Sequence, residues 1–121
     1  MMQELGGRTL LAVAMLTCGN CSSRAEDTKN LGDIFTLYQY CIGERDTGDG
    51  MIHFGFCLGY ISGVTDEMRA EKSICMSEGV ATAATVQAFI NWATGHPDKW
   101  NLYRLVGVRS ALTGAWPCKV E

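Results

Sequence analysis

Apolar side chains recur every three or four residues from residue 31 onward, which is the spacing of one face of an α-helix. We expect a first helix that is capped by Asn30, has Asp33 in the capping-box position and ends at Gly43. Its apolar face comprises Leu31, Ile34, Phe35, Tyr38, Cys41 and Ile42. Residues 44–50 are mostly charged or glycine, so they predict a loop.

Three further helices follow the same spacing. The second spans residues 51–70, residues 71–79 connect it to a third that stops at Gly95, and a fourth restarts at Pro97, whose missing N–H costs nothing in a first helical turn. Their apolar faces are Phe54, Cys57, Tyr60, Ile61, Val64 and Met68, then Ala83, Val86, Phe89, Ile90 and Ala93, then Leu102, Leu105, Val108, Leu112, Ala115 and Trp116. No window alternates as a strand does, so the pattern predicts an all-α, four-helix up-and-down bundle.

The N-terminus resembles a secretory signal peptide. Arg8 precedes an apolar run over residues 9–16, which is too short to cross a bilayer stably, and Ser23 and Ala25 place small side chains at the −3 and −1 positions of a cleavage site. We therefore expect residues 1–25 to be removed and residues 26–121 to form the helical domain in the periplasm. A buried N-terminal helix is one alternative. Acylation of Cys18 is another, but Thr17 makes a poor lipobox.

Composition narrows the class of protein. The chain has 121 residues, enough for one small domain, and 10 basic against 13 acidic side chains leave a net charge of -3, which gives a nucleic-acid backbone no basic surface to bind. Six cysteines are many for this length and indicate an oxidising compartment. Cleavage after Ala25 removes Cys18 and Cys21, and the four that remain are Cys41, Cys57, Cys75 and Cys118.

Three pairings of four cysteines are conceivable, and the helix order ranks them. Cys41 lies near the end of the first helix and Cys57 lies across a short loop in the second, at a similar height along the helix axes. Cys75 precedes the third helix and Cys118 follows the fourth, so an antiparallel hairpin brings both to one end of the molecule. We predict the disulfides Cys41–Cys57 and Cys75–Cys118, which would staple the bundle.

The chain offers no convincing catalytic or cofactor site. His53 and Cys57 are four residues apart and would share a helix face as a base and a nucleophile, but the predicted disulfide consumes the thiol. Two distant histidines without a carboxylate cluster make no metal site, and Ser62 misses the nucleophile-elbow spacing by one position. We expect neither enzymatic activity nor a metal or cofactor. The row of Gly55, Gly59 and Gly63 predicts close helix packing inside the bundle or at a dimer seam.

One resemblance speaks to function. It is carried by Tyr38 and Cys41, by C-x-G-Y-I-S-G-V-x-D over residues 57–66, by Cys75 and His96-Pro97, and by Ala111-Leu112 and Ala115-Trp116-Pro117-Cys118. This constellation resembles the Rap/Tai family of periplasmic immunity proteins of type VI secretion systems. The resemblance implies an all-helical protein, in some members dimeric, that binds and inhibits a peptidoglycan-cleaving amidase effector. An exported structural or interaction protein without an effector, and a small periplasmic chaperone, are the alternatives.

The predicted contact surface lies in the connector after the second helix. It carries Asp66, Glu67, Glu71 and Glu78, opposed only by Arg69 and Lys72, and Cys75 anchors it. A loop fixed by a disulfide loses little entropy on binding, and its acidic balance would steer it toward a basic rim on an enzyme.

Overall fold

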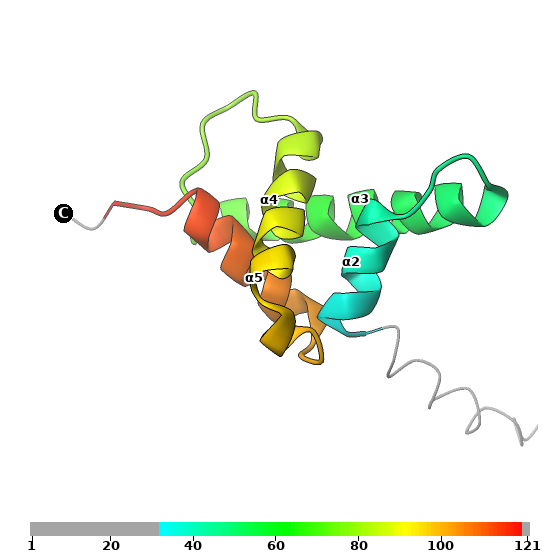
Figure 1. Cartoon of the computed structure of the whole chain (residues 1–121). Helices are drawn as coiled ribbons and strands as arrows, with labels where there is room; N and C mark the ends of the chain where they lie inside the picture. The colour runs from blue at the N-terminus through cyan, green and yellow to red at the C-terminus, as the bar shows by residue number, and fades with distance from the viewer. Residues whose placement is uncertain (1–31, 120–121) are drawn as a thin grey trace, which may run out of the picture.

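A computed structural model of the chain describes residues 32–119, and the regular elements within that range are helices joined by loops. The helices are α2 (Ile34–Ile42), α3 (Gly48–Ala70), α4 (Thr82–Gly95), a 3-10 turn η1 (Pro97–Lys99) and α5 (Arg104–Ala115). Figure 1 shows the long α3 running across α2, α4 and α5, so the bundle is crossed rather than uniformly aligned. The predicted all-α, four-helix class is confirmed.

The start of α2 differs from the prediction. Asp33, not Asn30, is the N-cap: its backbone is extended, and its side-chain oxygen accepts a hydrogen bond of 2.7 Å from the backbone N–H of Thr36. Asn30 and Leu31 lie outside the described residues. The helix therefore begins at Ile34, because Asp33 acts as the cap rather than as the third helical residue of a capping box.

The start of α3 also moves, toward the N-terminus. The predicted loop of residues 44–50 ends at Thr47, whose hydroxyl accepts a hydrogen bond of 3.0 Å from the backbone N–H of Gly50. This cap lets Gly48 and Gly50 enter the helix, although glycine has low intrinsic helix propensity. The prediction of a helix beginning at residue 51 was therefore wrong by almost one turn.

The fourth helix does not begin directly at Pro97. Residues 96–103 instead form a short connection between α4 and α5, which we call the strap. Pro97 opens only the 3-10 turn, and α5 begins at Arg104. The strap is pinned to the start of α2 by backbone hydrogen bonds, including Ile34 N–H to Leu102 C=O at 2.9 Å and Arg104 N–H to Gly32 C=O at 2.7 Å. Leu102 consequently lies before the helix and is exposed, so its placement on the apolar face of the fourth helix was wrong.

The core is built from all four helices. Its fully buried side chains are Phe89, Ile34, Leu37, Ile61, Met68, Leu112, Val108, Cys41 and Cys57. Because each helix contributes at least one of them, removal of any helix would expose the apolar faces of the others. No helix within residues 32–119 is long and apolar enough to cross a membrane.

Both predicted disulfides are confirmed. Cys41 on α2 is bonded to Cys57 on α3, with Cα atoms 5.3 Å apart, and Cys75 after α3 is bonded to Cys118 after α5, with Cα atoms 4.8 Å apart. The second bond closes 43 positions of sequence, and in the chain-entropy account the longer loop constrains the unfolded chain more.

The glycine row of α3 does not pack inside the bundle, which corrects half of its prediction. Gly55, Gly59 and Gly63 are exposed, and a Cβ added to any of them would have no neighbouring atom within 4 Å. The reason is that α3 turns its opposite face, with Cys57 and Ile61, toward the core. The dimer-seam half of the prediction is untouched by this result.

Candidate functional site

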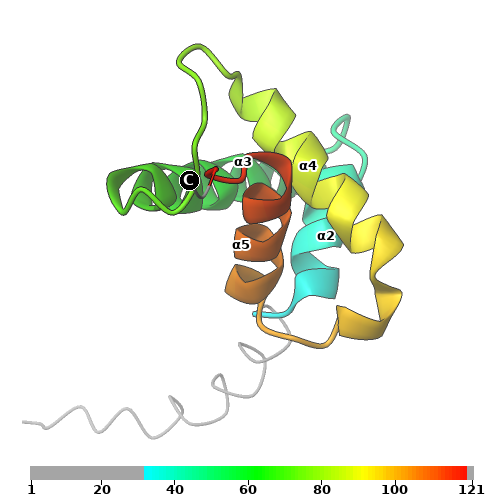
Figure 2. The ribbon, with the colours of Figure 1, turned by 90° about the vertical axis from the view of Figure 1, so that its left-hand side faces the viewer.

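The connector between α3 and α4, residues 71–81, stands away from the helices (Figures 1 and 2). Its first half is anchored in three ways: Ile74 is buried in the core, Cys75 is bonded to Cys118, and the backbone N–H of Cys75 donates to the carbonyl of Trp116 at 3.0 Å. The second half turns at Gly79, whose φ of 87° suits glycine. The connector is thus a projecting loop on a fixed base.

Glu71 is tied to a neighbouring helix. Its carboxylate lies 2.9 Å from the guanidinium of Arg109 on α5, and the hydroxyl of Ser73 donates to the same oxygen at 3.3 Å. The hydrogen bond from Arg109 is the main cause that lowers the pKa of Glu71, and the same contact raises the pKa of Arg109. Much of the charge of Glu71 is therefore offset within the chain.

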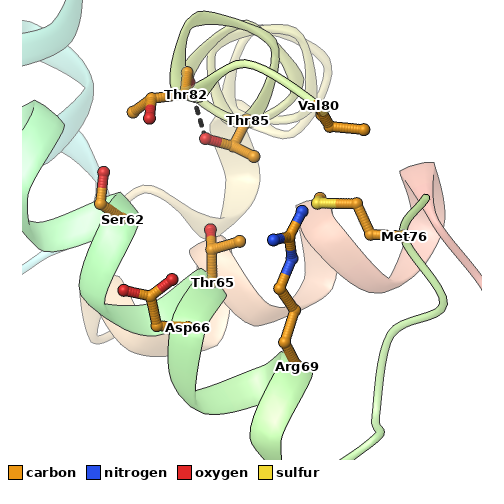
Figure 3. Close-up of a pocket in the computed structure, with 8 residues that line it drawn as sticks. All are labelled: Ser62, Thr65, Asp66, Arg69, Met76, Val80, Thr82 and Thr85. Carbon is orange, nitrogen blue, oxygen red and sulfur yellow. Dashed lines mark hydrogen bonds between the residues drawn. The ribbon is translucent and has the colours of Figure 1, made fainter. Parts of the chain in front are cut away.

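The other three predicted contact residues, Asp66, Glu67 and Glu78, are exposed. Asp66 lies at a small pit of about 70 Å³, which is lined by Ser62, Thr65, Asp66, Arg69, Met76, Val80, Thr82 and Thr85 (Figure 3). In this pit the side chain of Arg69 extends from α3 toward the start of α4 (Figure 3). A wider hollow of about 500 Å³ places Glu78 with Arg69 as well. Arg69 thus lines both hollows, the first together with Asp66 and the second together with Glu78.

Two of the polar side chains that line the pit donate hydrogen bonds within the protein. The hydroxyl of Thr65 donates to the carbonyl of Ile61 at 2.7 Å, and the hydroxyl of Thr85 donates to the carbonyl of Thr82 at the same distance (Figure 3). These bonds satisfy the two buried threonine donors within their own helices. Both threonine hydroxyls are therefore already paired within the protein.

A second surface, which the sequence analysis missed, lies at the other end of α3. A hollow of about 530 Å³ is lined by Gly32, Tyr40, Ile52, His53, Phe56, Tyr103 and Arg104. Ile52 and Tyr103 are 70% and 56% exposed there, unusually high for large apolar and aromatic side chains at one hollow. The signal was present in the sequence: Ile52 and Phe56 are four residues apart and lie off the predicted core face of α3.

Contacts between aromatic rings connect several of the side chains that line this hollow, which we call the aromatic hollow. Tyr40 stacks on His53 with ring centroids 4.2 Å apart and meets Phe56 edge-on at 5.8 Å. The guanidinium of Arg104 lies 4.6 Å from the ring centre of Tyr60, close enough for a cation–π contact. Partial burial is the main cause that raises the pKa of Tyr60 above its ordinary value.

The structure places both nucleophile candidates that the sequence analysis considered, Cys57 and Ser62. The sulfur of Cys57 is bonded to Cys41, so it has no thiolate for His53 to activate, and Ser62 lies in the middle of α3. Within residues 32–119 no group of three or more histidine, cysteine or acidic side chains is placed to hold a metal ion.

Comparison with known proteins identifies the family. Neither the curated proteins nor the solved structures yield a match to this chain. A model of the Rap1a immunity proteins, in contrast, matches residues 33–118, from the N-cap of α2 to the second cysteine of the Cys75–Cys118 disulfide. Within residues 32–119 the match therefore includes all four helices and both disulfides, and the chain belongs to the Rap1a immunity protein family.

Proposed function

We propose that this protein is a periplasmic immunity protein that binds and inhibits a peptidoglycan amidase delivered by a type VI secretion system. The observation that carries the proposal is the family match over residues 33–118. The amidase and the type VI context rest on the motif resemblance over residues 57–66 and 116–118. Two disulfides agree with a protein that works outside the reducing cytosol.

The projecting connector suits the role of an inhibitor. Because Ile74 and the Cys75–Cys118 bond fix its base, it needs little further ordering when a partner binds. Glu78 lies on its exposed part, next to Gly79, where a carboxylate is accessible to a basic rim around an enzyme cleft. We propose this end of the molecule as the surface that contacts the amidase.

The first experiment tests the function itself. The mature chain is mixed with the amidase encoded by the neighbouring reading frame, and peptidoglycan cleavage and binding are measured together. We expect a stoichiometric complex and loss of cleavage. Free cleavage with no complex would contradict the assignment for that pair, and chaperone activity toward unrelated unfolded proteins would favour a different function.

The second experiment tests the surface. Glu78→Lys is a cleaner probe than Glu71→Lys, because replacing Glu71 also breaks its ion pair with Arg109. We expect Glu78→Lys to weaken binding about tenfold or more, since it places like charge against a basic rim. Glu44→Lys, an equal charge change in the exposed loop before α3, is the matched control. Loss of binding in Tyr103→Ala alone would move the interface to the aromatic hollow.

Export is proposed on the signal-peptide pattern of residues 1–25, which lie outside the described residues. Mass spectrometry of a periplasmic extract should find a chain that begins at Glu26. An intact Met1, or a lipid on Cys18, would contradict it.

A homodimer through the outer face of α3 is the second partner that we propose. The open glycine row borders a hollow of about 390 Å³ that Gly59 and Gly63 share with Tyr60 and Leu105, so the backbone of another helix has room to approach. Sedimentation of Gly59→Leu should then show monomers where the wild type shows dimers. A monomeric wild type would rule the seam out.

A further inference from the structure

We propose that Cys75–Cys118 is a redox-sensitive clamp on the connector, whereas Cys41–Cys57 is a structural bond that resists reduction while the protein stays folded. The two bonds differ in access. Cys41 and Cys57 are 1% and 0% exposed between α2 and α3, whereas Cys75 is exposed and Cys118 is half-buried at the surface. Thiol–disulfide exchange requires a thiolate to reach a sulfur atom, so access decides which bond reacts first.

The reductant is a dithiol, either a small molecule or the cysteine pair of an oxidoreductase. One of its thiolates attacks a sulfur of the Cys75–Cys118 bond, forms a mixed disulfide and releases the other cysteine as a thiolate, which takes up a proton. The second thiol of the reductant then displaces the first cysteine. The protein gains two electrons and two protons as two thiols, and the dithiol leaves as a disulfide.

Opening the clamp releases a defined part of the chain. Cys75 and Cys118 are the covalent link between the connector and the segment after α5, and the sulfur of Cys118 lies 3.7 Å from the carbonyl of Lys72. Ile74 still anchors the base of the loop in the core after reduction. Residues 76–81 then keep only the half-buried Met76 and Val80 as side-chain anchors, so this stretch gains freedom while the four helices remain.

Opening of the clamp should also weaken binding of the amidase, a consequence that rests on the proposed function. If the connector contacts the amidase, the reduced loop must become ordered when it binds. This loss of conformational entropy lowers the affinity for the amidase. Burial of Cys41–Cys57 keeps the core intact meanwhile. The oxidised and reduced forms would therefore be folded proteins of different affinity.

The first experiment compares how fast the two disulfides are reduced, and it needs no amidase. The oxidised mature protein is treated with dithiothreitol without denaturant, quenched with iodoacetamide at intervals and mapped by mass spectrometry, with circular dichroism recorded alongside. We expect Cys75 and Cys118 to be alkylated at least about tenfold faster than Cys41 and Cys57, while the helical signal persists. Equal rates for both pairs, or reduction only as the helical signal disappears, would overturn the clamp.

The second experiment uses a variant in which the Cys75–Cys118 bond cannot form, as in the reduced protein. Cys75→Ser/Cys118→Ser should remain helical, show faster hydrogen exchange in peptides covering residues 76–81, and bind the amidase about tenfold more weakly than the wild type. Cys41→Ser/Cys57→Ser is the matched pair, for which we expect a lower melting temperature and unchanged exchange in the connector. Unchanged exchange in Cys75→Ser/Cys118→Ser would overturn the clamp. Faster exchange with unchanged affinity would overturn its link to binding, and a wild type that binds no amidase would instead count against the proposed function.

Discussion

The carboxylate of Glu71 and the guanidinium of Arg109 lie 2.9 Å apart and join the residue that follows α3 to the middle of α5. Both side chains are more than a third exposed, so the pair works in contact with water. The ion pair lies at the start of the connector, which begins at Glu71 and reaches the Cys75–Cys118 bond within a few residues. An ion pair and a disulfide therefore hold the first half of the connector, one to the middle of α5 and the other to the segment that follows α5.

Replacing Glu71 with glutamine should change how stability depends on pH. The pKa of Glu71 is lowered from 4.5 in the folded protein, so its ion pair stabilises the fold at neutral pH, and this contribution is lost as the pH falls from 4.5 through the lower folded value. Glu71→Gln should be slightly less stable than the wild type near neutral pH and equally stable in acid. Urea unfolding of both proteins across that range measures the difference. A difference that persists unchanged in acid would show that the ion pair is not its source.

Loss of the cap on α2 should destabilise the protein. The side chain of Asp33 accepts a hydrogen bond from the backbone N–H of Thr36, and Asp33→Ala removes that acceptor. We expect a loss of about 0.5–2 kcal/mol in the free energy of unfolding, measured by denaturant titration. Asp33→Asn keeps an acceptor oxygen and is the control, which should stay close to the wild type. Equal loss in both variants would mean that the charge, and not the cap, matters.

The sequence predicted those parts of the fold that depend on periodic apolar positions. Phe89 and Val86 fall on one stripe of α4 and are buried, and the two disulfides follow from helix order. Helix ends were harder, because Asp33 and Thr47 cap through hydrogen bonds that depend on local backbone geometry. Several polar residues near a helix start compete for that role, and spacing alone does not choose between them.

The candidate surfaces were less predictable, because they depend on how helices cross. Glycines at every fourth position fit tight packing and an open face equally well, and only the orientation of α3 shows that Gly59 faces outward. The aromatic hollow likewise needs Tyr103, from the strap before α5, beside Ile52 from α3. Spacing along one helix carries no information about a neighbour that is about 50 positions away in the chain.

Truncation of Phe89 should be the most damaging single change in the core. The ring is fully buried, and its removal leaves a cavity among side chains from the other helices. We expect Phe89→Ala to lower the free energy of unfolding by about 3–5 kcal/mol. Ile52→Ala removes a side chain that is largely in water and should have little effect. Similar midpoints for the two variants in a denaturant titration would contradict the burial of Phe89.

The close approach that was predicted at Gly59 occurs instead at Gly107, and a pair of alanine substitutions separates the two positions. A Cβ on Gly107 would lie 2.8 Å from Cγ1 of Ile34 and 3.2 Å from Cζ3 of Trp92, and Ile34 is itself fully buried, so it has little room to move. Gly107→Ala should therefore destabilise the protein by about 1–3 kcal/mol, reduced by the better helix propensity of alanine. In the single chain a Cβ on Gly59 meets open space, so at a protein concentration low enough to keep the chain monomeric Gly59→Ala should gain up to about 1 kcal/mol from propensity. Opposite shifts of the melting temperature under these conditions would support this assignment of the close contact. A destabilised monomeric Gly59→Ala would contradict it, whereas a loss of stability that appears only at higher concentration would support the proposed homodimer.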